Sequence, residues 1–312
     1  MSVVHDRHQD VLVLRSDHSL LGGIHLRSNE TIYGIFNLME AMRLAHPVPE
    51  GHSPPRRALI MYSFPFPSSL HIDVDVPFSS SSGLGVGITA TALQALGCVV
   101  DAVEIDDVVL QYARQYFHYS NKHGLDIVGD GRAFVDGLCG NGTRGRYDYI
   151  AHDVFSGGSV PQQLFSEEVF DCLKLLMKPD GVLALNYPGQ VNSLTTQSVA
   201  KTLKSSFSHV RAFGDEFEKA PFRNMVFFAS PSALNFRAPL KSEFMGSQIR
   251  ENELDDFQER EITPSLVDSK GEESAIIFTD YNNNLAKLQQ VMTDGHALVM
   301  DQILPHEFWA RC

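Results

Sequence analysis

GLGVG at residues 83–87 runs directly into ITATALQAL at residues 88–96. The apolar residues of the second segment recur with the spacing of a helix, and the glycines before it allow a tight turn. A glycine turn in front of a helix can hold an anion or a nucleoside. The stretch therefore predicts a nucleotide-type binding site at Gly83, Gly85 and Gly87.

Acidic residues end the three buried strands predicted after this turn. They are Glu104 and Asp106 after CVVDAV at 98–103, Asp130 after LDIV at 125–128, and Asp153 after YDYIA at 147–151. Ligands of open parallel sheets bind beyond the carboxyl ends of the strands, so we expect these acids to share a pocket. Glu104 is the predicted partner of ribose hydroxyls, since it follows the first glycine at the expected spacing. In the alternative interpretation, Glu104, Asp130 and Asp153 are ordinary helix N-caps.

At these residues the chain resembles the S-adenosylmethionine-dependent transferases, and more closely the spermidine/spermine synthase (aminopropyltransferase) family. The matching segments are Val103–Asp106, Gly129–Gly131, Tyr147–Asp153, LFSEEVF at 164–170 and LMKPDGV at 176–182. The resemblance implies an α/β fold with a Rossmann-like class I methyltransferase sheet of seven strands. It also implies a small N-terminal β-hairpin region and a C-terminal extension.

The same resemblance implies a donor and its contacts. The donor is S-adenosylmethionine or its decarboxylated form, used as a co-substrate without a metal. Glu104 would bind the ribose and Asp130 the adenine amino group, and Asp153 would lie beside the sulfonium and the acceptor amine. Asp106 and Gly131 complete the expected donor site, and Asp106 is also expected to cap the helix that follows it.

Two departures from the family pattern concern the reaction. Polyamine synthases carry an acid inside the glycine loop, which holds the aminopropyl ammonium, and here that place is Val86. They carry a second acid beyond the first, which takes the acceptor's proton, and here that place is Ser156. An apolar side chain cannot pair with an ammonium, and a hydroxyl is a poor general base without help. Methyl transfer to an amine is therefore the favoured reaction.

Two other functions stay open at this point. One is aminopropyl transfer from decarboxylated S-adenosylmethionine, as in spermidine and spermine synthases. The other is a non-catalytic paralogue that keeps the fold and acts as a binding protein.

Methyl transfer depends mainly on positioning, because the sulfonium is already activated. Asp153 or His152 could take the proton, with Ser156 beside them in the expected catalytic set. Alternatively, His152 is a strand-end histidine whose ring nitrogens are satisfied by hydrogen bonds. Asn186 and Tyr187 end the next predicted strand, where they either contact the acceptor or pack in the core.

Before the glycine turn, residues 10–26 predict a β-hairpin whose turn spans Asp17 to Gly23. Residues 30–44 predict an amphipathic helix, in which the resemblance makes Tyr33 a pocket-lining residue. A strand at 56–60 should then enter the glycine turn, but residues 61–82, rich in Pro and Ser, intervene. They are either a surface excursion with its own strand at 70–76 or a translated intron in the gene model.

After the acid motifs, helices are predicted at 107–117, 166–177 and 193–206, with strands at 182–187, 210–213 and 224–229. The predicted domains are a hairpin and helix at 1–55, the donor-binding domain at 56–235 and an acidic extension at 236–312. We expect the extension to be a solvated tail with loops. Within it, residues 276–282 should close against the core and Trp309 should dock the end.

Composition bounds the class of protein and its partners. The chain has 312 residues, 43% of them hydrophobic, and a net charge of −13. Lys and Arg are not clustered in the sequence, so we do not expect nucleic-acid binding. The negative charge favours a small amine or polyamine-like acceptor instead. Four scattered cysteines predict neither a metal site nor a disulfide framework.

No signal peptide or membrane-spanning segment is recognised, so we expect a cytoplasmic protein that does not bind membranes. The resemblance also implies a homodimer.

Overall fold

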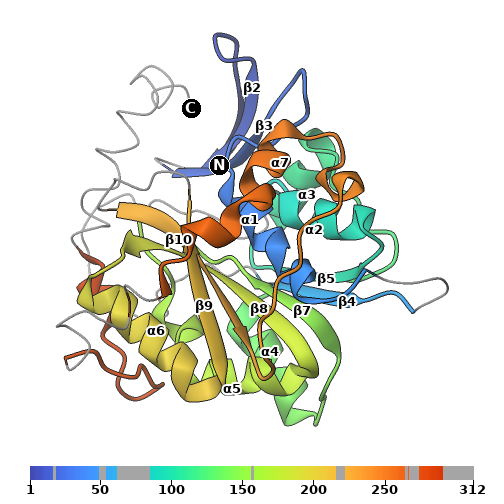
Figure 1. Cartoon of the computed structure of the whole chain (residues 1–312). Helices are drawn as coiled ribbons and strands as arrows, with labels where there is room; N and C mark the ends of the chain where they lie inside the picture. The colour runs from blue at the N-terminus through green and yellow to red at the C-terminus, as the bar shows by residue number, and fades with distance from the viewer. Residues whose placement is uncertain are drawn as a thin grey trace, which may run out of the picture.

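The computed structural model describes residues 1–16, 19–48, 54–61, 85–155, 158–215, 222–263, 266 and 274–290. A seven-stranded sheet with the strand order β6-β5-β4-β7-β8-β10-β9 lies at its centre, with helices on both faces (Figure 1). The strands are β4 (Arg57–Met61), β5 (Val99–Glu104), β6 (Asp126–Val128), β7 (Tyr147–His152), β8 (Met177–Gln190), β9 (His209–Gly214) and β10 (Phe222–Ser230). Strands β4 to β8 are parallel, and β10 runs antiparallel to both of its neighbours. The predicted α/β class and the antiparallel closing hairpin are confirmed.

The helices are α1 (Ile35–Met39), α2 (Ile88–Ala95), α3 (Asp107–Tyr116), α4 (Gly131–Gly140), α5 (Glu167–Leu176), α6 (Leu194–Ser206), α7 (Gln248–Asp255) and α9 (Leu285–Leu288). Helices α2 to α6 alternate with the strands from β4 to β9, as crossover connections require. Short 3₁₀ helices are η1 (Glu40–Ala45), η2 (Gln162–Leu164), η3 (Lys241–Phe244) and η4 (Phe257–Arg260). The first helix starts later than the predicted residue 30, because Thr31 pairs with Ile24 in a β-bridge.

Two apolar clusters cover the two faces of the sheet. Helices α1, α2, α3 and α7 pack on one face, and α4, α5 and α6 pack on the other. Side chains alternate between the faces along each strand, so Ile60 joins the first cluster and Leu59 and Met61 join the second. This alternation decides which side chains at the strand ends can share a site. We call the first face the α1 face.

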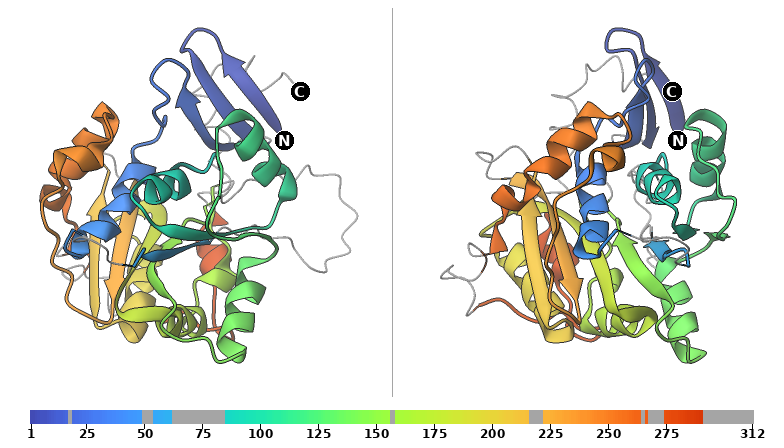
Figure 2. Two further views of the ribbon diagram at one scale, coloured as in Figure 1. Left: turned by 90° about the vertical axis from the view of Figure 1, so that its right-hand side faces the viewer. Right: turned by 45° about the vertical axis from the view of Figure 1, so that its right-hand side comes forward.

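A small antiparallel sheet precedes the main one. It consists of β1 (Ser2–Asp6), β2 (Val11–Ser16) and β3 (Ser19–His25), and it stands off the central sheet on the side of α2 and α3 (Figure 2). The hairpin formed by β2 and β3 is confirmed, whereas β1 was not predicted. Gly22 and Gly23 lie inside β3 instead of in the turn, and residues 17 and 18 lie outside the described residues.

The C-terminal region packs on the core in part, so the prediction of a solvated tail is wrong for the acidic segment 251–261. Phe257 is 1% exposed and Phe278 is fully buried. The acids here are matched by arginines: Arg250 reaches Glu40 in η1 at 2.9 Å, and Arg260 reaches Glu253 at 2.9 Å. The sequence of this segment is rich in acids and therefore suggested a solvated tail. Its composition does not show that arginines pair with these acids and with Glu40 in the folded protein.

Residues 276–282 close against the core, as predicted. The backbone N–H of Phe278 donates to the hydroxyl of Thr202 in α6 at 2.9 Å. Asp280 accepts from the guanidinium of Arg132 in α4 at 2.6 Å and from the hydroxyl of Ser166 at 2.6 Å. The segment therefore ties the helices of the second face together.

Cys139 in α4 and Cys172 in α5 form a disulfide, with their Cα atoms 6.1 Å apart. The expectation of no disulfide is therefore wrong. The two residues are separated by 33 positions, and only the packing of α4 beside α5 brings them together. Cys98 is a free cysteine.

Reduction of this disulfide should lower the free energy of unfolding by about 2–4 kcal/mol, because the cross-link restricts the unfolded chain. Denaturant titrations with and without reductant measure the difference, and Cys98→Ser serves as the control. In unfolded protein, Cys139 and Cys172 should resist thiol labelling until reductant is added. Labelling before reduction would show that the bond is absent in solution.

Several predictions fall outside the described residues. Within 61–82 only Met61 is described, so both explanations of that segment stay open. The same holds for the expected docking of Trp309. In the described part of the chain, no helix is both long enough and apolar enough to cross a bilayer.

Candidate functional site

The glycine turn has the backbone that its sequence predicts. Gly85 and Gly87 have φ angles of 52° and 79°, and Gly87 is the N-cap of α2. A Cβ on Gly85 would lie 2.3 Å from the carbonyl oxygen of Leu21 in β3, and one on Gly87 would lie 2.8 Å from the ring of Tyr119. Both positions therefore require glycine. Gly83 lies outside the described residues.

Glu104 is the last residue of β5 and is 1% exposed. Its Oε1 accepts the backbone N–H of Asp106 at 3.0 Å. Asp106 in turn caps α3, because its Oδ1 accepts the N–H of Val108 at 2.9 Å. The predicted cap is confirmed, and Glu104 is held at the strand end by the turn that follows it.

Asp130 follows β6 and caps α4, with its Oδ1 accepting the N–H of Ala133 at 2.8 Å. The N-cap interpretation is therefore correct for Asp130. Gly131 is the first residue of α4 and is buried. A cap uses only one carboxylate oxygen here, so the predicted adenine contact of Asp130 remains a prediction.

Asp153 directly follows β7 and is 7% exposed. Its Oδ1 accepts an N–H from Nδ2 of Asn186 in β8 at 2.9 Å. Burial raises the pKa of Asp153 to about 6, and the hydrogen bond from Asn186 opposes that rise. The Oδ1 of Asn186, which is 5% exposed, has no hydrogen-bond partner within the described part of the chain. Sequence analysis placed Asn186 at a strand end without deciding between contact and packing, and the structure joins it to Asp153.

His152 lies on the opposite face of the sheet, which corrects its prediction as a proton acceptor. Its side chain is fully buried against Phe165 and Phe170, and its Nε2 lies 3.1 Å from the carbonyl oxygen of Leu164. Burial lowers the pKa of His152 to about 4. The interpretation of His152 as a hydrogen-bonded strand-end histidine therefore holds for Nε2, whereas its buried Nδ1 has no hydrogen-bond partner among the described residues. Ser156, the third predicted catalytic residue, lies outside the described residues.

The strand registers bring Glu104 and Asp153 to one edge of the sheet. Met61 at the end of β4 pairs with Val103 on one side and with His152 on the other. The next residue on each neighbouring strand is an acid, so the two acids flank the end of β4. Alternation directs both toward the α1 face, where α2 carries the glycine turn. Asp130 lies at the same edge, one strand further out.

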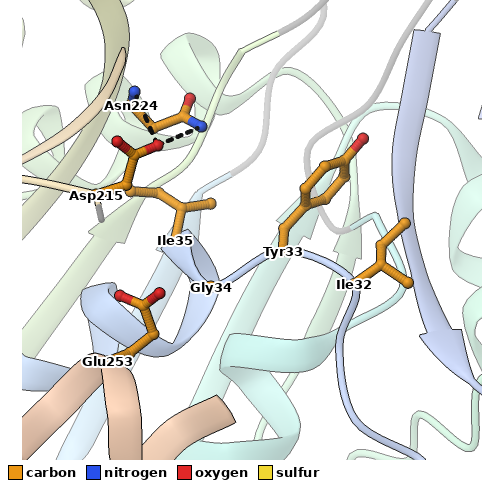
Figure 3. Close-up of a pocket in the computed structure, with 7 residues that line it drawn as sticks. All are labelled: Ile32, Tyr33, Gly34, Ile35, Asp215, Asn224 and Glu253. Atoms are coloured by element: carbon orange, nitrogen blue, oxygen red, sulfur yellow. Dashed lines mark hydrogen bonds between the residues drawn. The ribbon is translucent and has the colours of Figure 1, made fainter. Parts of the chain in front are cut away.

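A cavity of about 100 Å³ lies on the α1 face near this edge (Figure 3). Its lining residues are Ile32, Tyr33, Gly34, Ile35, Asp215, Asn224 and Glu253. Tyr33 was expected to line the pocket from the resemblance, whereas the three acidic and amide residues were not predicted. Asp215 directly follows β9, Asn224 lies in β10 and Glu253 lies in α7, all of them far from Tyr33 in the sequence. Glu253 belongs to the segment interpreted as a solvated tail.

The described residues contain no group of three or more His, Cys, Asp or Glu side chains that could hold a metal ion.

Comparisons with known proteins agree with this geometry. Residues 88–217 match the family model of the spermine/spermidine synthase domain. An N-terminal histidine N-methyltransferase of Emericella nidulans is 33% identical over 334 residues, which cover 99% of this chain and 55% of that protein. A polyamine aminopropyltransferase of Vibrio vulnificus is 37% identical over 90 residues, or 28% of this chain and 29% of that protein.

A probable spermidine synthase from Corynebacterium glutamicum has a similar fold, with a TM-score of 0.63 at 16% identity. The superposition covers 89% of this chain and 92% of that one. The chain spans about half the length of the Emericella protein. The resemblance found in the sequence is thus confirmed: residues 88–217 match the spermine/spermidine synthase domain, and the fold is similar to that of a probable spermidine synthase.

Proposed function

We propose that this protein transfers the methyl group of S-adenosylmethionine to a nitrogen of an acceptor amine. The donor's ribose would bind Glu104, its adenine would lie beside Asp130, and its sulfonium would lie between the glycine turn and Asp153. The edge of the sheet at which these residues lie is where ligands of such folds bind.

The buried position of Val86 is the observation that carries the choice of methyl over aminopropyl transfer. Val86 is 2% exposed, and its side chain packs on the backbone of Gly22 in β3. Decarboxylated S-adenosylmethionine would bring an ammonium to the glycine turn, where an apolar side chain offers it no partner. S-adenosylmethionine carries the corresponding ammonium beside its own α-carboxylate, so this ammonium depends less on an acidic partner in the turn.

The reaction then needs few groups from the protein. The lone pair of the acceptor nitrogen attacks the methyl carbon, and the carbon–sulfur bond breaks with its electron pair returning to sulfur. The nitrogen loses one proton, which Asp153 accepts. Positioning in a water-poor site supplies most of the acceleration, and the base contributes the rest.

The acceptor that we propose is the N-terminal histidine of a peptide or protein. The support is the Emericella relative, whose similarity extends over 99% of this chain. A net charge of −13 also favours a cationic acceptor. A small polyamine is the competing acceptor, because the Vibrio relative acts on polyamines by its name.

Donor preference tests the choice of reaction. Calorimetric titration should show tighter binding of S-adenosylmethionine than of its decarboxylated form. The matched variant is Val86→Asp, which should shift the preference toward the decarboxylated donor by restoring a carboxylate in the turn. A peptide with N-terminal histidine, incubated with S-adenosylmethionine, should gain 14 Da per transferred methyl group in a mass spectrum. Preference of the wild-type protein for the decarboxylated donor would contradict the proposal.

The rate should depend on pH through Asp153. A base must be ionised, so kcat/KM should rise as pH increases through about 6, the pKa of Asp153, and level off above it. Asn186→Leu removes the hydrogen bond that lowers this pKa, so the rising limb should move to higher pH. The acceptor's own titration is common to both proteins and cancels in the comparison. If kcat/KM of the variant rises at the same pH as that of the wild-type protein, ionisation of Asp153 does not cause the rise.

A further inference from the structure

A row of polar side chains leads from Asp153 to the cavity of Figure 3. Asp153 is bonded to Asn186 at 2.9 Å. Asn186 pairs with Val226 across β8 and β10, so Asn224 is its diagonal neighbour on the same face, at about 7–8 Å. The side chain of Asn224 then donates to Asp215 at 3.4 Å, and both residues line the cavity.

The Oδ1 of Asn186 indicates that a ligand donates a hydrogen bond along this row. It is a buried carbonyl oxygen with no hydrogen-bond partner among the described residues, on a side chain that is 5% exposed. Leaving such a group unsatisfied costs about 1–3 kcal/mol. Its amide nitrogen is already used by Asp153, so the oxygen can accept a hydrogen bond from a bound ligand.

The polar part of the cavity wall carries two carboxylates, those of Asp215 and Glu253. The ring of Tyr33 also lines the wall, with its hydroxyl pointing away from them (Figure 3). Arg260 ion-pairs with Glu253 at 2.9 Å, which holds one of these carboxylates in place. Basic groups are the natural ligands of such a wall, because each N–H gains a charged acceptor.

Helix α7 closes the cavity. A Cβ on Gly34 would lie 2.1 Å from Oε1 of Glu253, so the glycine allows α7 to approach the start of α1. Tyr33, Asn224 and Glu253 all lie outside residues 88–217, which match the family domain. The cavity is therefore formed largely by parts of the chain outside that domain. These parts can give this protein an acceptor specificity that the domain alone does not determine.

We propose that this cavity binds a basic side chain on the third residue of the acceptor peptide. This inference rests on the proposed function, which places the first residue at Asp153. In an extended peptide, residues 1 and 3 point to the same side and are about 6.6 Å apart. Asn186 is bonded to Asp153, so residue 1 would lie beside both side chains, and that spacing is close to the distance of about 7–8 Å between Asn186 and Asn224. The ammonium of a lysine at position 3 would then donate to Asp215 and Glu253.

Three synthetic peptides test the proposal: His-Gly-Lys-Gly-Gly, His-Gly-Nle-Gly-Gly and His-Gly-Glu-Gly-Gly, where Nle is norleucine. For the wild-type protein, kcat/KM should be about tenfold higher with lysine than with norleucine, as one charge-assisted hydrogen bond provides. The glutamate peptide should be the poorest of the three.

Variants assign this preference to the cavity. Asp215→Asn keeps an oxygen for Asn224 but removes the charge, so the lysine-to-norleucine ratio should fall toward one. Asn224→Asp adds a carboxylate and should raise the ratio, which a misfolded protein cannot do. Asp255→Asn, at an exposed end of α7, is the matched control and should leave the ratio unchanged.

Peptide binding, titrated calorimetrically in the presence of S-adenosylhomocysteine, separates the two proposals. Tighter binding of the lysine peptide without any methylation would support the cavity and contradict the proposed function. Equal methylation of the lysine and norleucine peptides, with equal binding, would overturn the cavity proposal and leave the proposed function intact.

Discussion

Asp153→Asn should lower kcat by about 100-fold or more at pH 8, within the range that general bases contribute. The amide cannot accept a proton, but it keeps the shape of the side chain and an oxygen for Asn186. Donor affinity, measured by calorimetry, should fall much less than kcat, because the lost charge lies beside the sulfonium but only the reaction needs the base. Stability should not fall, since burial already disfavours the ionised form of Asp153.

The matched control is Asp171→Asn, the same change at an exposed position of α5 on the other face of the sheet. It should leave kcat unchanged. If Asp153→Asn keeps wild-type kcat at pH 8 while the control behaves as expected, positioning alone accounts for the rate and the protein needs no base at this position.

The pairing of Asp153 with Asn186, and the exclusion of His152, could not be decided from the sequence. Residues 147–152 are buried on both faces of the sheet, so their pattern shows no alternation of apolar and polar residues. Sequence alone could place His152 and Asp153 at a strand end, but it could not assign them to opposite faces. That assignment requires knowing which helices cover each face.

The glycine turn and the helix caps were predictable because their causes are local. A run of glycines before an apolar helical pattern requires positive φ angles at the turn, which Gly85 and Gly87 have. Asp106 and Asp130 each precede a helix by one residue, the usual position of a cap. Their structural role follows from the sequence, and only donor binding remains to be tested.

The cavity was not predictable, because its residues are joined only by long-range packing. Tyr33 precedes the domain, while Asp215 and Glu253 lie in β9–β10 and α7. The acidic composition around Glu253 suggested a solvated tail, since a window of sequence cannot show that Arg250 pairs with Glu40, 210 positions away. The folded C-terminal region thus supplies a wall that composition alone argued against.

Glu104→Gln should weaken donor binding by about 10- to 100-fold, since hydrogen bonds to a charged group contribute about 1.5–3 kcal/mol. In the proposed complex, the carboxylate accepts hydrogen bonds from both ribose hydroxyls, while a carboxamide offers one oxygen. Glutamine can still accept the N–H of Asp106, so the turn after β5 should keep its structure. Calorimetric titration with S-adenosylmethionine measures the change in Kd directly.

At saturating donor, the same variant should keep kcat within about threefold of wild type, because the ribose contacts are equally strong in the ground state and the transition state. Asp107→Asn, an exposed position in the first turn of α3, is the matched control and should leave Kd unchanged. This split between Kd and kcat distinguishes Glu104 from Asp153, whose loss should act mainly on kcat. If Glu104→Gln keeps the wild-type Kd, the ribose does not bind at the end of β5. That result would also contradict the proposed position of the donor over the glycine turn.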